Sequence, residues 1–65
     1  MFEEYIGRKV KIYAEIGDRP FSFEGTVLAV NETHLKLLDK FEKEQLILLE
    51  SIEQATPLPE QEARP

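Results

Sequence analysis

The chain has 65 residues, no cysteine, and 13 acidic against 8 basic side chains, which gives a net charge of −5. A chain this short forms one domain with a marginal core, and without cysteine it has no disulfide or thiolate metal site, so oligomerisation is the remaining source of stability. The charge opposes non-specific attraction to nucleic acid or anionic lipid. With no apolar run long enough for a membrane span and no signal-peptide pattern, we expect a cytoplasmic protein with no membrane partner.

The start of the chain predicts a short helix followed by a strand. Phe2, Tyr5 and Ile6 recur at helical spacing, and Gly7 is a typical helix end. From residue 8 to residue 16 the period of the apolar side chains changes to two. This alternation predicts a half-buried strand whose inward side chains are Val10, Ile12, Ala14 and Ile16.

A second strand is predicted from about Phe21 to Val30, after a turn at residues 17–20 that contains glycine and proline. The alternation of its side chains slips near the end of the strand. A slip of phase near a mid-strand glycine is typical of a bulge or sharp bend, which lets a short sheet curl onto itself. The inward side of this strand is predicted to comprise Phe23, Gly25, Val27 and Val30.

A third strand is predicted from His34 to Asp39, with Leu35 and either Leu37 or Leu38 inward. It follows a turn at residues 31–33, where the asparagine suits a left-handed backbone conformation. After a polar connection come a fourth strand, residues 45–49, and a last short strand, residues 50–55. The domain is therefore expected to cover residues 1–56, and the Pro- and Glu-rich residues 57–65 to form a disordered tail.

The fourth predicted strand is apolar on both faces. An edge strand that faced water should be polar on one face, because bare apolar edges aggregate. We therefore expect a second subunit to cover this strand. The predicted interface residues are Leu46, Ile47, Leu48, Leu49 and Ile52. Phe41, in the charged loop just before, either stacks a base, contacts a partner or folds back over the end of the barrel.

The sequence offers no arrangement typical of catalysis or metal binding. His34 is the only histidine, Ser22 and Ser51 are the serines, and the many carboxylates show no known ligand spacing. We expect no enzymatic activity, no cofactor and no metal.

A basic cluster lies at the start of the first predicted strand. Arg8, Lys9 and Lys11 follow the aromatic residues Phe2 and Tyr5, a combination that favours nucleic-acid binding. Alternatively, the lysines are the solvated face of an alternating strand and the aromatic rings belong to the core. Acidic residues that offset the basic charge favour this second interpretation; they are Glu15, Glu24 and Glu32.

Residues 6–57 resemble the Sm-like superfamily, including its bacterial Hfq branch. The second strand carries the resemblance: Phe23, one residue, Gly25, one residue, Val27, and then Asn31, which lies six residues after the glycine. The short N-terminal helix, the segment 35–38, and a proline five residues after Ile52 also fit. The resemblance implies a strongly bent barrel of five strands, SH3-like or Sm-like. In that family the fourth strand pairs with the fifth strand of a neighbour to close a ring of roughly five to seven subunits.

The resemblance also implies an RNA site. In Sm-like proteins the loop after the second strand holds uridine, and Asn31 matches its first position, but Leu35 occupies the second and Thr33 stands where Hfq has a stacking aromatic residue. Glu50 falls where the family places a basic or aromatic group. The predicted RNA-binding residues are Asn31, Thr33, His34, Arg8, Lys9 and Lys11.

Two functions follow from these patterns. The first is an Sm-like homo-oligomeric ring that binds RNA weakly or through a surface other than the family pocket. The second is a homo-oligomeric module for protein interaction and assembly, without nucleic-acid binding.

Overall fold

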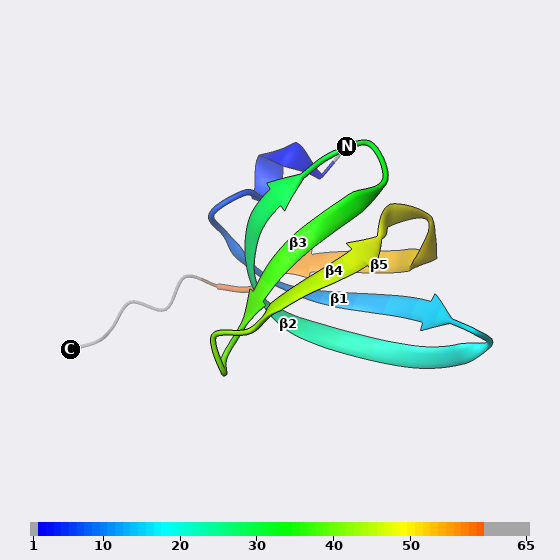
Figure 1. Ribbon diagram of the computed structural model, residues 1–65. Helices are drawn as coiled ribbons and strands as arrows, with labels where there is room; N and C mark the ends of the chain where they lie inside the picture. Colours follow the sequence, from blue (N-terminus) through cyan, green and yellow to red (C-terminus); the bar gives the residue numbers. More distant parts are fainter. Residues whose placement is uncertain (1, 60–65) are drawn as a thin grey trace.

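The computed structural model describes residues 2–59, which form one antiparallel sheet of five strands (Figure 1). The strands are β1 (Lys9–Ile16), β2 (Arg19–Val30), β3 (His34–Asp39), β4 (Glu44–Leu48) and β5 (Ile52–Pro57). They lie in the order β4-β3-β2-β1-β5, so β4 and β5 are the two edges. Short 3-10 turns precede β1 and connect β4 to β5: η1 (Glu3–Tyr5) and η2 (Leu49–Ser51). The predicted fold class, an all-β bent sheet with a short N-terminal helical turn, is confirmed.

The sheet curls so that β3 and β4 lie across β1 and β5, and the inward side chains meet between them (Figure 1). The predicted alternation of β1 and β3 is confirmed, because β1 buries every second side chain up to residue 14 and β3 buries Leu35 and Leu37. The core residues are Val10, Ile12, Ala14, Val27, Leu35, Leu37 and Ile47. Each is at most 3 % exposed.

Ile16 does not belong to the core, contrary to prediction, since 42 % of its surface is exposed. Its backbone pairs with Arg19 at the closed end of the β1–β2 hairpin, whereas the pairing of β5 with β1 stops at Ala14. The hairpin therefore extends beyond the rest of the sheet as a two-stranded arm (Figure 1). Nothing within the described chain crosses over Ile16 to complete its burial.

The turn of this arm is tighter than predicted. Gly17 and Asp18 both have positive φ, 60° and 65°, which suits a two-residue hairpin turn. Arg19 and Pro20, predicted to lie in the turn, instead begin β2. Pro20 lies opposite Glu15, and in this register the backbone nitrogen of Pro20 faces away from β1. β3 does not reach that side of the arm, so no ladder hydrogen bond is lost through the proline.

The predicted bend in β2 is confirmed. The register between β2 and β3 shifts between Val27 and Ala29, which marks a bulge. A Cβ atom at Gly25 would overlap the carbonyl oxygen of Leu38, so the backbones of β2 and β3 approach at a distance that only glycine allows. The close pairing of β2 with β3 beside the bend therefore depends on this residue.

The ends of the last two strands differ slightly from the prediction. β4 ends at Leu48, and Leu49 begins η2. β5 includes Pro57, and the N–H of Leu58 donates to the carbonyl oxygen of Lys9. The ordered backbone thus continues past the predicted domain end at residue 56, and residues 60–65 of the predicted tail lie outside the described residues. No helix in the described part of the chain is long and apolar enough to span a membrane.

Candidate assembly edges and nucleic-acid interface

The β2–β3 turn carries the residues that the Sm-like resemblance assigns to RNA. Its backbone is held by Asn31, whose Oδ1 accepts hydrogen bonds from the N–H groups of Thr33 and His34, both 2.8 Å long. Asn31 does not adopt the predicted left-handed conformation, because the non-glycine residues with positive φ in the described chain are Asp18 and Glu42. The side-chain oxygen of Asn31, which the resemblance assigns to base recognition, already accepts these two backbone hydrogen bonds.

The surroundings of this turn are acidic. The hollow beside it is lined by Glu3, Asn31, Glu32 and Thr33. The Thr33 hydroxyl forms a hydrogen bond with Nδ1 of His34, 2.8 Å long. The backbone of Leu49 donates to Thr33 O, which brings η2 and its exposed Glu50 next to the turn. Two sequence-predicted RNA-binding residues, Thr33 and His34, are thus bonded to each other in an anionic environment that disfavours phosphate.

The basic cluster lies elsewhere, on the outer face of β1. Arg8 and Lys9 are exposed, and the ammonium group of Lys11 lies 5.6 Å from the centre of the Tyr13 ring. In the ladder with β2, Lys9 is opposite Thr26 and Lys11 is opposite Glu24. The structure therefore brings Lys9 and Lys11 together with Tyr13, a residue that the sequence interpretation had not included. The period-two spacing 9, 11, 13 is the sequence signal that identifies it.

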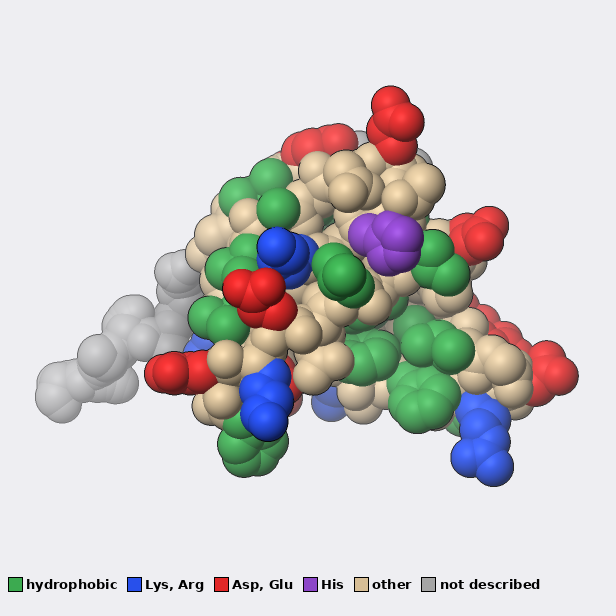
Figure 2. Space-filling view, viewed as in Figure 1, with side chains coloured by type: hydrophobic (Ala, Val, Ile, Leu, Met, Phe, Trp, Pro, Cys, Tyr) green, Lys and Arg blue, Asp and Glu red, His purple; other side chains and the backbone are tan. Residues whose placement is uncertain are grey.

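The predicted interface residues of β4 separate into two groups. Ile47 is 2 % exposed and packs in the core of its own chain, whereas Leu46 is 65 % and Leu48 is 43 % exposed. Figure 2 shows hydrophobic side chains over β4 and again over the β1–β2 arm. Leu49 and Ile52 are partly buried against the core. Of these residues, Leu46 and Leu48 expose the most surface to a partner, whereas Ile47 exposes almost none.

The backbone hydrogen bonds show which groups of β4 face the free edge. The N–H of Asp39 donates to Lys43 O, and the N–H of Leu49 donates to Thr33 O, so the odd-numbered residues of β4 bond to β3. The backbone groups of Glu44, Leu46 and Leu48 consequently point away from the sheet. Because no strand within residues 2–59 pairs with β4 on its outer side, these groups are open to another chain.

β5 follows the same pattern at the opposite edge. Leu58 donates its N–H to β1, so the even-numbered residues at this end of β5 face β1. Ala55 and Pro57 then direct their backbone groups to the free edge. Pro57 lacks an N–H group, and an edge strand tolerates proline where its nitrogen faces the free edge, as it does here.

Two carboxyl groups near these edges have altered pKa values. Hydrogen bonds lower the pKa of Asp39, chiefly one from the backbone N–H of Lys43 and then one from the Gln45 side chain. A hydrogen bond to Glu15, together with the charge of that carboxylate, raises the pKa of Glu53 on β5. Within residues 2–59, no three potential metal ligands of the His, Cys, Asp or Glu type lie close enough to hold an ion.

The comparisons with known proteins add no identification. No family model matches the sequence, and no match was found among curated proteins or solved structures. The Sm-like resemblance therefore stays a prediction.

Proposed function

We propose that this protein is a non-catalytic, Sm-like binding protein that assembles by joining β4 of one copy to β5 of the next. The observation that carries the proposal is the outer face of β4. An edge strand with open backbone groups here displays two large leucines, Leu46 and Leu48, that are 65 % and 43 % exposed within one chain. Natural edge strands that face water are protected by charge, proline or shortness, and these two positions have no such protection.

The pairing is head-to-tail, because two different edges meet. A contact of this type closes into a ring or continues as a filament, and we propose the ring of roughly five to seven subunits. Opposed residues in a ladder share one face. We pair Leu46 with Ala55 of the partner subunit. Leu46 then lies beside the two partly buried apolar residues of that strand, Ile52 and Ala55 of the partner subunit.

The test is the mass of the particle in solution. Multi-angle light scattering on the wild-type chain is expected to give a multimer, and the double variant Leu46→Lys with Leu48→Lys a folded monomer. The matched control is Ile6→Lys with Leu28→Lys, since these residues are similarly exposed, 48 % and 37 %, but lie outside β4. The control is expected to assemble as the wild type does. A wild-type chain that is monomeric and stable would contradict the proposal.

A second candidate function is RNA binding by the outer face of β1. It is favoured by the alignment of Lys9, Lys11 and Tyr13, which offers two cations beside an aromatic ring. Fluorescence anisotropy with U-rich and A-rich oligonucleotides at two salt concentrations tests it. The double variant Lys9→Ser with Lys11→Ser is expected to lower the slope of log affinity against log salt concentration by the equivalent of about two phosphate contacts.

The control for that experiment is Lys40→Ser with Lys43→Ser, which changes the net charge equally on the β3–β4 turn. Absence of binding at low salt would exclude RNA and leave the interaction module without nucleic-acid binding.

A further inference from the structure

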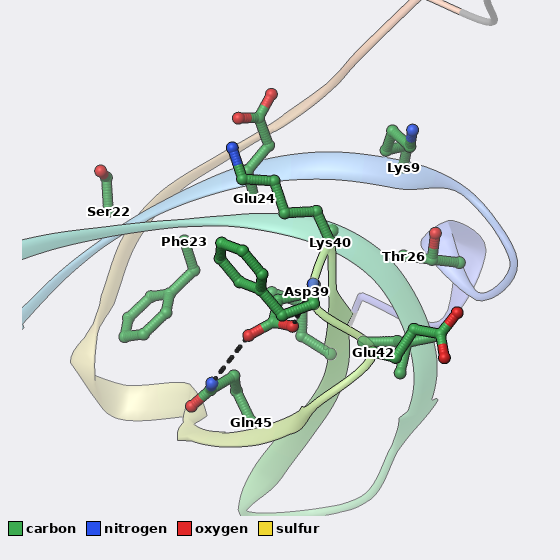
Figure 3. A pocket seen from close by; sticks show the side chains of 13 residues that line it. Lys9, Ser22, Phe23, Glu24, Thr26, Asp39, Lys40, Glu42 and Gln45 are labelled. Carbon is green, nitrogen blue, oxygen red and sulfur yellow. Dashed lines mark hydrogen bonds between the residues drawn. The ribbon is translucent and has the colours of Figure 1, made fainter.

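A groove lies at the corner between the β1–β2 arm and the β3–β4 turn. β2 pairs with β3 only from Gly25 onward, so the earlier part of β2 has no neighbour on that side, and the β3–β4 turn stands beside it. The space is about 680 Å³ in volume. Figure 3 shows the ring of Phe23 and the amide of Gln45 near the Asp39 carboxylate, and Phe41 also lines the groove. The groove thus has aromatic walls and a polar floor.

Phe41 is the most exposed large hydrophobic residue in the described chain, at 71 %. The turn that presents it is held by Asp39, whose Oδ1 accepts the N–H groups of Phe41 and Lys43, both at 2.9 Å. The Oδ2 atom of Asp39 accepts the Gln45 side-chain N–H at 3.0 Å. Hydrogen bonds therefore hold the backbone of the turn that presents the aromatic ring, which reduces the ordering that the turn needs when a partner covers it.

The register of the proposed edge pairing determines which residues arrive at this groove. The free-edge backbone groups of β4 begin at Glu44, and those of β5 end at Pro57. Antiparallel pairing that matches the strands end to end places Glu44 opposite Pro57 of the partner subunit and Leu46 opposite Ala55 of the partner subunit. The next residue, Leu58 of the partner subunit, then lies opposite Lys43, beside the Phe41 turn.

The side-chain directions agree with this placement. Gln45 lies on the inward face of β4, because Ile47, two residues further along, is in the core. Opposed residues share a face, so Thr56 of the partner subunit falls beside Gln45, and Leu58 of the partner subunit points toward the same side as the groove. Leu58 is only partly buried in its own chain.

We propose that the partner subunit's Leu58 inserts between Phe23 and Phe41, so that each subunit docks the end of its β5 in the groove of the next copy. This inference rests on the proposed assembly and specifies its register. The occupant is a second copy because the β4 edge, which ends at the groove, directs an antiparallel strand to it. The Phe41 ring becomes buried on assembly, and Leu58 and Phe41 become energetically coupled.

A tryptophan reporter tests the proposal, since the sequence has no tryptophan. Phe41→Trp is expected to show blue-shifted emission in the multimer and solvent-exposed emission after dilution to monomers. Adding Leu58→Ser to this reporter chain is expected to remove most of the blue shift and to weaken assembly about tenfold. The control reporter Leu28→Trp, exposed on β2, is expected to emit alike in monomer and multimer.

The outcomes separate this inference from the proposed function. A multimer in which the emission of the Phe41→Trp reporter stays solvent-exposed, and in which Leu58→Ser assembles as the wild type does, would overturn the docking and leave edge assembly intact. A blue shift that persists in dilute monomers would mean that residues of the same chain cover the reporter, and it would also overturn the docking. A wild-type chain that is monomeric would overturn both proposals.

Discussion

β3 and β4 are neighbouring strands with similar aliphatic content, yet their outer faces differ. On β3 the outward residues His34 and Lys36 are polar, and on β4 the residues opposite them are leucines: Lys36 pairs with Leu46, and His34 pairs with Leu48. At the end of the two strands the order is reversed, because Leu38 lies opposite Glu44. Leu35, Leu37 and Ile47, on the inward faces of the two strands, are buried. At two positions of this face the edge strand β4 is therefore apolar where the inner strand β3 is polar. This is the reverse of what an isolated sheet requires.

The backbone sharpens the contrast. β3 is bonded on both sides, to β2 and β4, while β4 is bonded on one side only. A strand that is unpaired along one edge and apolar on its outer face has two separate reasons to accept another strand. The inner face of β4 therefore serves the fold, and its outer face, by our proposal, serves assembly. The following variants test that division, beginning with the largest expected effect.

Ile47→Asp is expected to prevent folding. The residue is 2 % exposed, and the substitution removes core packing worth about 3 kcal/mol or more while burying a charge. Far-UV circular dichroism and a urea titration measure the loss of the native state. The same substitution at Leu46, 65 % exposed, is expected to keep the fold. A cooperative native-like transition for Ile47→Asp would contradict the assignment of this residue to the core.

Gly25→Ala tests the paired centre of the sheet. The new Cβ would overlap the Leu38 carbonyl oxygen, so β2 and β3 must separate, at a cost of about 1–3 kcal/mol. Thermal unfolding of the variant should show this loss. Ser22→Ala, on the exposed arm of the same strand, is expected to change stability by less than about 0.5 kcal/mol. Equal stability of the two variants would mean that the bend does not need the glycine.

Asp39→Asn acts on the turn that joins β3 to β4. Since the folded-state pKa of Asp39 lies below its ordinary value of 3.8, its ionised form stabilises the fold above that pH, and this contribution is lost as the pH falls through the folded pKa. Melting temperatures of wild type and variant should differ at neutral pH and converge in acid. Parallel profiles over the whole range would argue against these hydrogen bonds.

Glu53→Gln concerns the other edge strand and is expected to have the smallest effect. The pKa of Glu53 lies above its ordinary value of 4.5, so the stability that its protonated form contributes is present below that pH and is lost as the pH rises through the folded pKa. The variant should therefore melt slightly higher than wild type at neutral pH and show no gain near pH 4.5. A lower melting temperature at neutral pH would contradict a repulsive Glu15–Glu53 pair.

Much of the sheet was predictable because alternation is a local property. The bounds of β3 and the buried side of β1 as far as Ala14 agree with the pattern of the residues, and the bend was signalled by Gly25 together with the slip of phase. The turn was predicted to cover residues 17–20, but it consists of Gly17 and Asp18, and β2 begins at Arg19. A proline ends a strand only if its missing N–H faces a neighbour, and whether it does depends on the register of the hairpin.

The candidate sites were less predictable. From residue type, Asn31 was predicted to bind RNA and Ile47 to lie in the subunit interface. The side-chain oxygen of Asn31 instead accepts hydrogen bonds within its own turn, and Ile47 points into the core between two outward leucines. The sequence singled out Phe41 but not the groove beside it, because the walls of the groove come from β2, β4 and the turn between β3 and β4.

The sequence by itself determined that the chain would alternate, bend at one glycine and form a small all-β sheet, because side-chain period and backbone freedom act over a few neighbouring residues. Only the tertiary structure decided which face of β4 lies in the core, which backbone groups remain open at the edges, and where Phe41 stands. Those properties depend on register and on contacts between segments far apart in the chain, and no local pattern records them.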